Sequence, residues 1–78
     1  MKDNSREFLI ELGNRIKTLR QSRKLTLEAF CYLNGLEPST VMRIEKALTT
    51  AKVTTLLKIA QGFDMSLPEL LNIPLSSQ

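Results

Sequence analysis

The segment Asn-Gly-Leu-Glu-Pro at 34–38 is a tight break between two short stretches in which apolar residues recur at helical spacing. Asparagine and glycine tolerate left-handed backbone angles, so a helix can end at Asn34 and Gly35 at little cost. Proline presets the backbone angle of a first helical turn, so a new helix can begin at Pro38. The sequence therefore predicts two short helices, at about 26–34 and 38–46, joined by a sharp turn.

The remaining apolar residues also recur at helical intervals, and no strand-like alternation of useful length occurs. A long helix is expected at about 5–22, a fourth helix at about 53–63, and a short fifth one after Ser66, which forms a capping box with Glu69. A chain of 78 residues supplies one hydrophobic core but not two. These patterns predict an all-α fold with five helices in a single compact domain.

Local chemistry predicts details of the two central helices. The hydroxyl of Thr26 is expected to cap the first helix. In the second helix, Val41, Ile44 and Leu48 fall on one side and are expected to pack, which leaves the polar side open. Alanine resists left-handed angles, so at Ala47 we expect this helix to continue for another turn, through Leu48.

One segment of the chain is strongly basic. Between residues 12 and 27 it carries five positive and no negative side chains: Arg15, Lys17, Arg20, Arg23 and Lys24. Such a cluster is a candidate surface for the phosphates of a nucleic acid. The alternative is an ordinary solvated helix face, which is the more common meaning of a short charge run.

The residue inventory argues against most catalytic chemistry. The sequence has no histidine and a single cysteine, Cys31, so it offers neither a zinc-ligand set nor a thiol–imidazole pair nor an internal disulfide. No signal peptide or apolar run of membrane length occurs. We therefore expect a cytoplasmic protein that is not an enzyme, with no metal, cofactor or small-molecule substrate, and with Cys31 packed in the core.

Two short helices joined by a tight glycine turn have the spacing of a helix-turn-helix motif. In this motif the first helix braces across the DNA backbone, and the second projects small polar and cationic side chains from its N-terminal half into the major groove. Ser39, Thr40 and Arg43 are side chains of this kind. The sequence thus predicts a DNA-reading segment at about 26–46.

Four fragments resemble, in their order and spacing, the phage-repressor and Cro type of helix-turn-helix domain, also called the xenobiotic-response-element family. They are LGNRIKTLR at 12–20, NGLEPSTVMRIEK at 34–46, TLLKIA at 55–60 and MSLPELL at 65–71. The resemblance implies a compact five-helix, lambda-repressor-like fold over 12–71. Residues 1–11 are then an N-terminal extension that continues into the first helix, and residues 72–78 are a C-terminal tail.

The resemblance also implies roles for individual residues. Arg20 and Glu45 correspond to a structural ion pair, and the neighbouring apolar face makes an unpaired carboxylate at Glu45 costly. Base contacts fall on the second central helix, at Pro38, Ser39, Thr40, Met42 and Arg43. Phosphate contacts are expected from Arg15, Lys46, Thr49 and Thr50.

Arg43 is the strongest candidate among these residues. Its guanidinium can bind O6 and N7 of guanine and contribute about 1–3 kcal/mol of base discrimination. The alternative is a surface ion pair of Arg43 with Glu37 or Glu45, which stabilises the protein little.

Three positions depart from the family pattern. Leu27 stands where a glutamine commonly contacts phosphate, and it is expected to join the core near Phe30 instead. Glu37, at the start of the second central helix, either accepts a hydrogen bond from a cytosine amino group or, as we favour, caps the helix. Ala47 stands where a glycine usually follows that helix.

The expected function is sequence-specific binding of duplex DNA by a transcriptional regulator, such as a phage-type repressor, a restriction-modification controller or an antitoxin. The alternative is a protein-interaction module that kept the fold and lost DNA affinity, as Leu27 and Glu37 permit.

A homodimer is expected, because operators with two half-sites are read by two copies of such a domain. The predicted interface is formed by Leu67, Leu71, Ile73 and Leu75, with Phe8 and Ile10 as further candidates. The alternative for these apolar residues is that the tail folds onto the core of its own chain.

Overall fold

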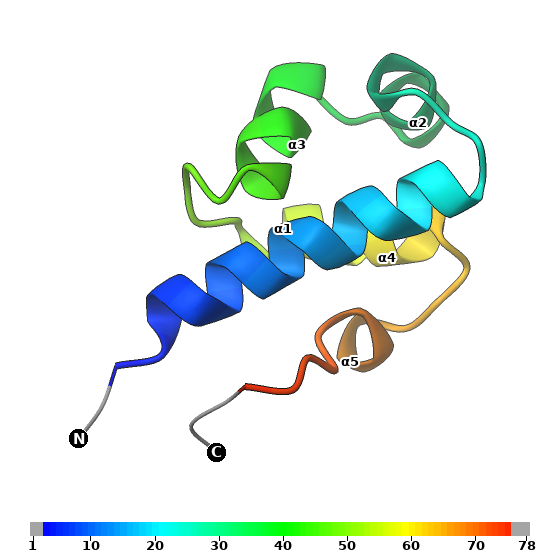
Figure 1. Cartoon of the computed structure of the whole chain (residues 1–78). Helices are drawn as coiled ribbons and strands as arrows, with labels where there is room; N and C mark the ends of the chain where they lie inside the picture. The colour runs from blue at the N-terminus through cyan, green and yellow to red at the C-terminus, as the bar shows by residue number, and fades with distance from the viewer. Residues whose placement is uncertain (1–2, 76–78) are drawn as a thin grey trace.

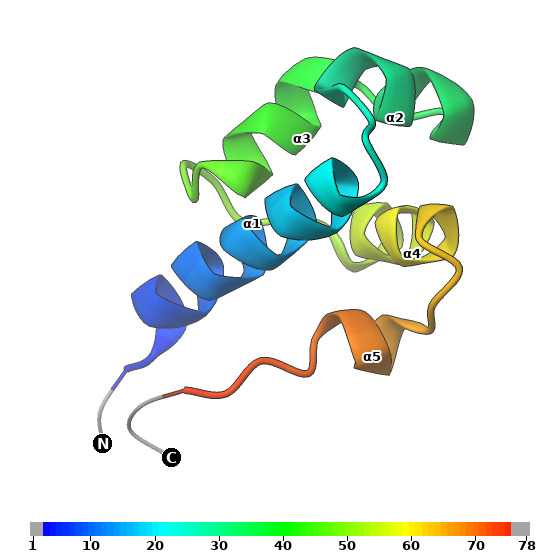
Figure 2. The same cartoon turned by 45° about the vertical axis from the view of Figure 1, so that its right-hand side comes forward.

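The computed structural model describes residues 3–75, which contain helices but no strands. The five helices are α1 (Ser5–Ser22), α2 (Leu27–Asn34), α3 (Pro38–Glu45), α4 (Val53–Gly62) and α5 (Leu67–Leu70). The long helix α1 crosses the middle of the molecule, with α2 and α3 on one side of it and α5 on the other (Figure 1). Figure 2 shows the same division and places α4 alongside the C-terminal half of α1. The predicted all-α fold with five helices is confirmed.

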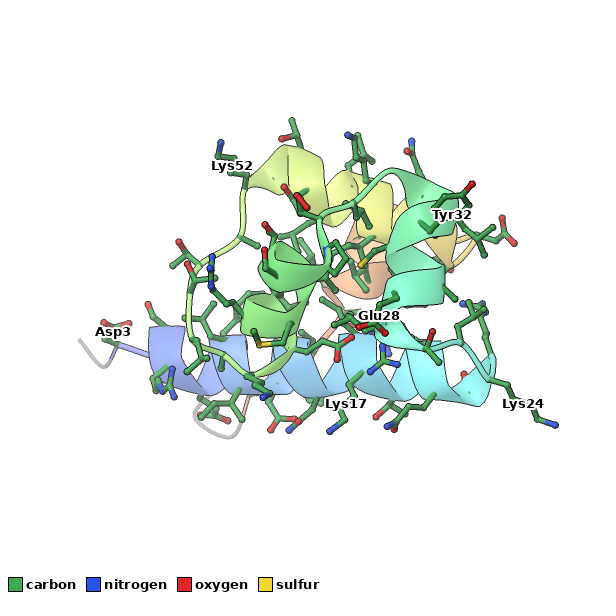
Figure 3. The ribbon with its side chains drawn as sticks, turned by 90° about the horizontal axis from the view of Figure 1, so that it is seen from above. Asp3, Lys17, Lys24, Glu28, Tyr32 and Lys52 are labelled. Atoms are coloured by element: carbon green, nitrogen blue, oxygen red, sulfur yellow. The ribbon has the colours of Figure 1, made fainter. Side chains whose placement is uncertain are left out.

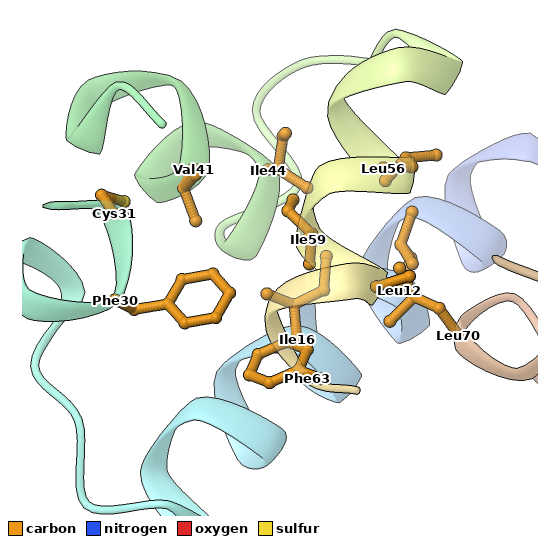
Figure 4. Close-up of a cluster of buried hydrophobic side chains, with 11 residues drawn as sticks. Leu12, Ile16, Phe30, Cys31, Val41, Ile44, Leu56, Ile59, Phe63 and Leu70 are labelled. Atoms are coloured by element: carbon orange, nitrogen blue, oxygen red, sulfur yellow. The ribbon is translucent and has the colours of Figure 1, made fainter. Parts of the chain in front are cut away.

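A single hydrophobic core lies between these helices (Figure 4). Every helix contributes to it, and its buried side chains are Leu12, Ile16, Phe30, Cys31, Val41, Ile44, Leu56, Ile59, Ala60, Phe63 and Leu70. The rings of Phe30 and Phe63 stack at its centre, with their centroids 4.6 Å apart. Cys31 is fully buried, as predicted, and burial raises the pKa of its thiol.

Four of the five helices end in the same way. One or two positions after each of these helix ends, a residue has a left-handed backbone: Lys24, Gly35, Ala47 and Asp64. The next residue is apolar in each case, and its N–H donates to a carbonyl five positions earlier, as from Leu25 to Arg20 (3.2 Å) and from Met65 to Ala60 (3.0 Å). This is the Schellman motif, which satisfies carbonyl groups that the end of a helix leaves without partners.

The expected continuation of α3 through Leu48 is wrong. Ala47 adopts a φ of 57°, so α3 ends at Glu45 and the N–H of Leu48 closes the turn on the carbonyl of Arg43 at 2.8 Å. The left-handed angle costs an alanine about 1–2 kcal/mol. Three features offset this cost: the closing hydrogen bond, burial of the alanine side chain, and a hydrogen bond from Arg6 to the carbonyl of Ala47.

Leu48 is consequently not part of the packing face that Val41 and Ile44 form. The chain turns away before Leu48, which is 66% exposed, whereas Val41 and Ile44 are buried as predicted.

No helix among residues 3–75 is long and apolar enough to cross a membrane.

Candidate nucleic-acid interface

The turn between α2 and α3 is built by residues that the sequence identified. The Thr26 hydroxyl accepts a hydrogen bond from the N–H of Ala29 (3.1 Å), which caps the start of α2 as predicted. Gly35 takes a left-handed φ of 64° at the end of α2, and Pro38 occupies the first turn of α3. These three positions fix the angle at which α3 leaves α2.

Helix α3 is held against α1 by direct backbone contact. Gly13 of α1 lies so close to the end of α3 that a Cβ atom there would stand 2.6 Å from the carbonyl oxygen of Ile44 and closer still to that of Glu45. Any side chain at this position would push the two helices apart. Gly13 therefore sets the distance between the long helix and α3.

An ion pair fixes the same end of α3. Arg20 donates from Nε to Glu45 Oε2 at 2.8 Å and from Nη2 to Oε1 at 3.0 Å, so the pair predicted from the family resemblance is present with bidentate geometry. The hydrogen bonds to Glu45 raise the pKa of Arg20 above its usual value. A third bond runs from Nη1 to the carbonyl of Leu25 (2.9 Å), so each of the three guanidinium nitrogens donates within the fold. Arg20 is therefore used within the fold.

The opposite face of α3 is open. No other helix covers α3 on the side seen in Figure 3. Ser39 and Arg43 of α3 are exposed. Pro38, Thr40 and Met42 are half-buried at its edges. Of the five residues predicted to contact bases, Ser39 and Arg43 are thus the exposed ones.

The alternative role for Arg43, a surface ion pair, is not realised. Among residues 3–75 the ion pair joins Arg20 and Glu45, and Arg43 pairs with neither Glu37 nor Glu45. The guanidinium of Arg43 is thus available to a ligand in front of α3.

The residues predicted to contact phosphate do not lie together. Lys46 and Thr50 are exposed just after α3, and Thr49 is half-buried between them. Arg15 faces a different part of the molecule: its Nε donates to the carbonyl of Leu70 and its Nη2 to that of Glu69, both at 2.9 Å. The structure thus gives Arg15 a role at the end of α5, and this placement does not support its prediction as a phosphate contact.

The basic segment at 15–24, which covers the second half of α1 and the two residues after it, serves mainly the fold. Arg15 binds the carbonyls at the end of α5, Arg20 binds Glu45 at the end of α3, and Arg23 donates to the carbonyl of Phe63 after α4 (2.9 Å) while lying over the Phe63 ring. The C-terminal end of a helix carries a negative partial charge, which a cation stabilises. Of the five basic residues, only Lys17 and Lys24 remain without such a contact within the described chain.

A hollow of about 330 Å³ between α1 and the end of α3 is lined by Asn14, which the sequence did not single out, and by Lys17, which the sequence placed only in the basic segment. Asn14 and Lys17 line it from α1, and Met42, Glu45 and Lys46 from α3 and the residue after it. Helical spacing is the sequence signal that could have identified them, because Asn14 and Lys17 lie one and four residues after Gly13, the residue at which α1 touches α3. Sequence patterns alone do not reveal which helix Gly13 contacts.

Two of the departures from the family pattern have clear structural outcomes. Leu27 packs against the core, as expected. Glu37 occupies the position before α3, but its side chain accepts no hydrogen bond there, so the favoured prediction that it caps the helix is wrong. The main-chain carbonyl of Glu37 accepts instead, from the N–H groups of Thr40 and Val41 at 3.1 and 3.2 Å.

The apolar residues predicted to form a dimer interface are largely used within the chain. Leu67, Leu71 and Ile73 are half-buried against the core, and Leu75 is also half-buried. Phe8 packs on the same core, whereas Ile10 is 39% exposed. The alternative, that the tail folds onto its own domain, describes the contacts of Ile73.

Comparison with known proteins assigns the chain to a family. The family model for a helix-turn-helix domain matches residues 11–72, which is most of the sequence. The protein therefore belongs to the helix-turn-helix domain family. A comparison with curated protein sequences gives no match.

Two solved structures are similar to this one. An HTH_3 family transcriptional regulator from Vibrio cholerae is 33% identical with a TM-score of 0.75, and the match covers 82% of this chain and 36% of the other. The restriction-modification controller protein C.AhdI from Aeromonas hydrophila is 31% identical with a TM-score of 0.74, over 80% of this chain and 94% of the other. The chain thus spans about a third of the Vibrio protein and nearly all of the controller. These matches confirm the predicted fold class and helix-turn-helix family.

Proposed function

We propose that this protein is a transcriptional regulator that binds duplex DNA sequence-specifically, with α3 in the major groove. The observation that carries the proposal is the open face of α3, where Ser39 and Arg43 are exposed and Arg43 has no ion-pair partner in the described chain. A helix in the major groove reads bases through side chains of this kind. The anchoring of α3 by Gly13 and by the pair of Arg20 and Glu45 supplies the fixed orientation that such reading requires.

In this proposal Arg43 binds guanine, and Ser39 and Thr40 form hydrogen bonds to bases or to nearby phosphates. Pro38 and Met42 make apolar contacts beside them. Lys46, Thr49 and Thr50 contact the backbone from the segment after α3. Arg15 is left out of this set, because its guanidinium is bound to the end of α5.

The two similar structures support the regulatory class. One is named a transcriptional regulator and the other a restriction-modification controller. For this chain we propose the same range of roles: phage-type repressor, restriction-modification controller or antitoxin-like regulator. We also propose a cytoplasmic location, because a regulator that binds operators needs access to the DNA.

We further propose that two copies bind an operator with two half-sites. A two-fold dimer places its reading helices one helical turn of DNA apart, about 34–36 Å, and one domain of this kind has a single α3. The proposed dimer interface consists of the surface that the core leaves uncovered on four half-buried residues: Leu67, Leu71, Ile73 and Leu75. Sedimentation of the protein with and without operator DNA tests this: one protomer per operator contradicts it.

A protein-interaction module is the second candidate function, and a specific observation favours it. Tyr32 and Leu33 on α2 are 88% and 67% exposed, and Leu27 leaves the start of α2 without the usual phosphate-binding glutamine. In that case the α2 surface, rather than α3, is the functional face of the domain.

Salt-dependent DNA binding separates the two functions. A DNA reader loses affinity for generic duplex steeply between low and moderate salt, because each phosphate contact releases counterions. A protein-interaction module shows little binding at either concentration, and that outcome refutes the proposal. Selection of bound sequences from a random duplex pool then gives the operator, and Arg43→Ala should relax the preference at one base position of it by about 1–3 kcal/mol.

A further inference from the structure

We propose that the hollow between α1 and the end of α3, the α1–α3 hollow, receives a backbone phosphate of the bound DNA, and that Lys17 and Asn14 hold it. This inference rests on the proposed function and assigns a contact to α1 that neither the family match nor the similar structures specify. The hollow has a volume of about 330 Å³ and is lined from α1 by Ile10, Asn14 and Lys17, and from the end of α3 and the turn after it by Met42, Glu45, Lys46 and Ala47.

The charge of the α1–α3 hollow favours an anion. Lys17 and Lys46 are both exposed and enter it from opposite walls. Glu45 is the acidic residue of the lining, and Arg20 neutralises it with two hydrogen bonds of 2.8 and 3.0 Å. Lys17 has no hydrogen bond or ion pair to another described residue, so its ammonium group is available to a ligand.

The position of the hollow specifies the kind of anion. An α-helix with its side chains is about 10–12 Å wide, and the major groove is about 12 Å wide, so a helix in the groove has a sugar-phosphate strand along each edge. The α1–α3 hollow lies along one edge of α3, beside Met42 and Lys46. A DNA strand that passes this edge brings its phosphates to Lys17.

Asn14 adds a neutral donor to the same site. Asn14 and Lys17 are three residues apart on α1, which places them next to each other on one face of the helix. The contact of Gly13 with the carbonyl groups of Ile44 and Glu45 brings this face to the edge of α3. The backbone positions of Asn14 and Lys17 are therefore fixed relative to α3.

The other edge of α3 is less suited to a phosphate. A hollow of about 210 Å³ there is lined by Thr40, Thr54 and Lys58, but also by Glu37. No ion pair in the described chain neutralises Glu37, so its carboxylate repels an anion. The two edges of α3 thus differ in charge, and the α1 edge is the more favourable one.

Lys17→Gln tests the inference, with the full chain and its selected operator. The loss of one phosphate contact lowers the slope of log K against log salt by about 0.9 per protomer, so between about 50 and 200 mM salt the wild type should lose about 3.5-fold more affinity per protomer than the variant. The decrease in slope caused by Lys17→Gln should be the same for the operator and for generic duplex DNA. Lys17→Arg, which keeps the charge, should restore the slope.

Lys24→Gln is the matched control, because it removes the same charge from the turn after the C-terminal end of α1, away from α3 (Figure 3). Thermal unfolding should be unchanged in Lys17→Gln, since Lys17 is exposed and makes no contact that the fold needs. An unchanged slope in Lys17→Gln refutes the inference and leaves the proposed function standing, as does an equal change in Lys24→Gln. Absence of salt-dependent binding by the wild type refutes the proposed function itself.

Discussion

Replacing Arg20 with methionine should destabilise the fold more than any single change on the surface. The side chains of Arg20 and Glu45 are only 11% and 7% exposed, so removal of the guanidinium leaves a carboxylate buried without its partner. Breaking a buried ion pair in this way costs about 3–5 kcal/mol. A domain of 78 residues has a total stability of roughly 4–12 kcal/mol, at about 0.05–0.15 kcal/mol per residue. Arg20→Met should therefore remove a large part of it.

The double variant Arg20→Met/Glu45→Leu separates the cost of a broken pair from the value of the intact one. Replacement of both charges by apolar side chains of similar volume is often neutral, or stabilising by about 1–4 kcal/mol. We expect the double variant to be more stable than Arg20→Met alone. Urea unfolding followed by circular dichroism gives the free energies of unfolding of the wild type, Arg20→Met, Glu45→Leu and the double variant, which together form the cycle.

The same cycle tests the role of Arg20 in DNA binding. Because three donors of its guanidinium are bound to Glu45 and to the carbonyl of Leu25, the double variant should keep its affinity for DNA once it is folded. A cost below about 1 kcal/mol for Arg20→Met, as for an exposed pair, refutes the structural role of the Arg20–Glu45 pair. In that case Gly13 and the core alone position α3.

Three further changes have expected outcomes. Gly13→Ala should destabilise the domain by about 1–3 kcal/mol in thermal unfolding, because the new Cβ meets the carbonyl oxygens of Ile44 and Glu45; an unchanged melting temperature contradicts this. Glu69 has a pKa lowered by its hydrogen bond with Ser66, so its contribution to stability is present above the usual pKa of 4.5 and is lost as the pH falls through the lower folded value; Glu69→Gln should flatten that part of the pH profile. The thiol of Cys31 should react with a disulfide reagent only after denaturation, because it is buried and its pKa is raised; rapid reaction of the native protein counts against the packing described.

The helices were predictable because their signals are local. The Thr26 cap, the proline at position 38 and the capping box of Ser66 and Glu69 each act within four residues, and all three are present in the structure. The same local rule failed at Ala47. Its left-handed angle depends on contacts made by Leu48 and by Arg6, a residue of α1 that is distant in the sequence.

The candidate site was predictable only in part, for a related reason. The face of α3 with Ser39 and Arg43 follows from helical periodicity within one element. The use of Arg15 depends instead on where α5 ends in space, and that is not encoded in the spacing of charges along α1. The run of basic residues at 15–24 predicted a DNA-facing surface, but its three arginines all bind the ends of other helices.

The distribution of these contacts separates stability from recognition. Arg15 and Arg20 of α1, and Arg23 just after it, bind the ends of α5, α3 and α4, and Gly13 sets the approach of α3. The orientation of α3, the proposed reading helix, therefore depends on residues that the proposed DNA contacts do not include. Ser39 and Arg43 are exposed and make no contact that holds the fold together. Substitutions there cost the domain little, since surface changes usually stay within about 0.5 kcal/mol. Under the proposed function, the operator preference can therefore change through α3 alone, while α1 maintains the architecture that presents α3.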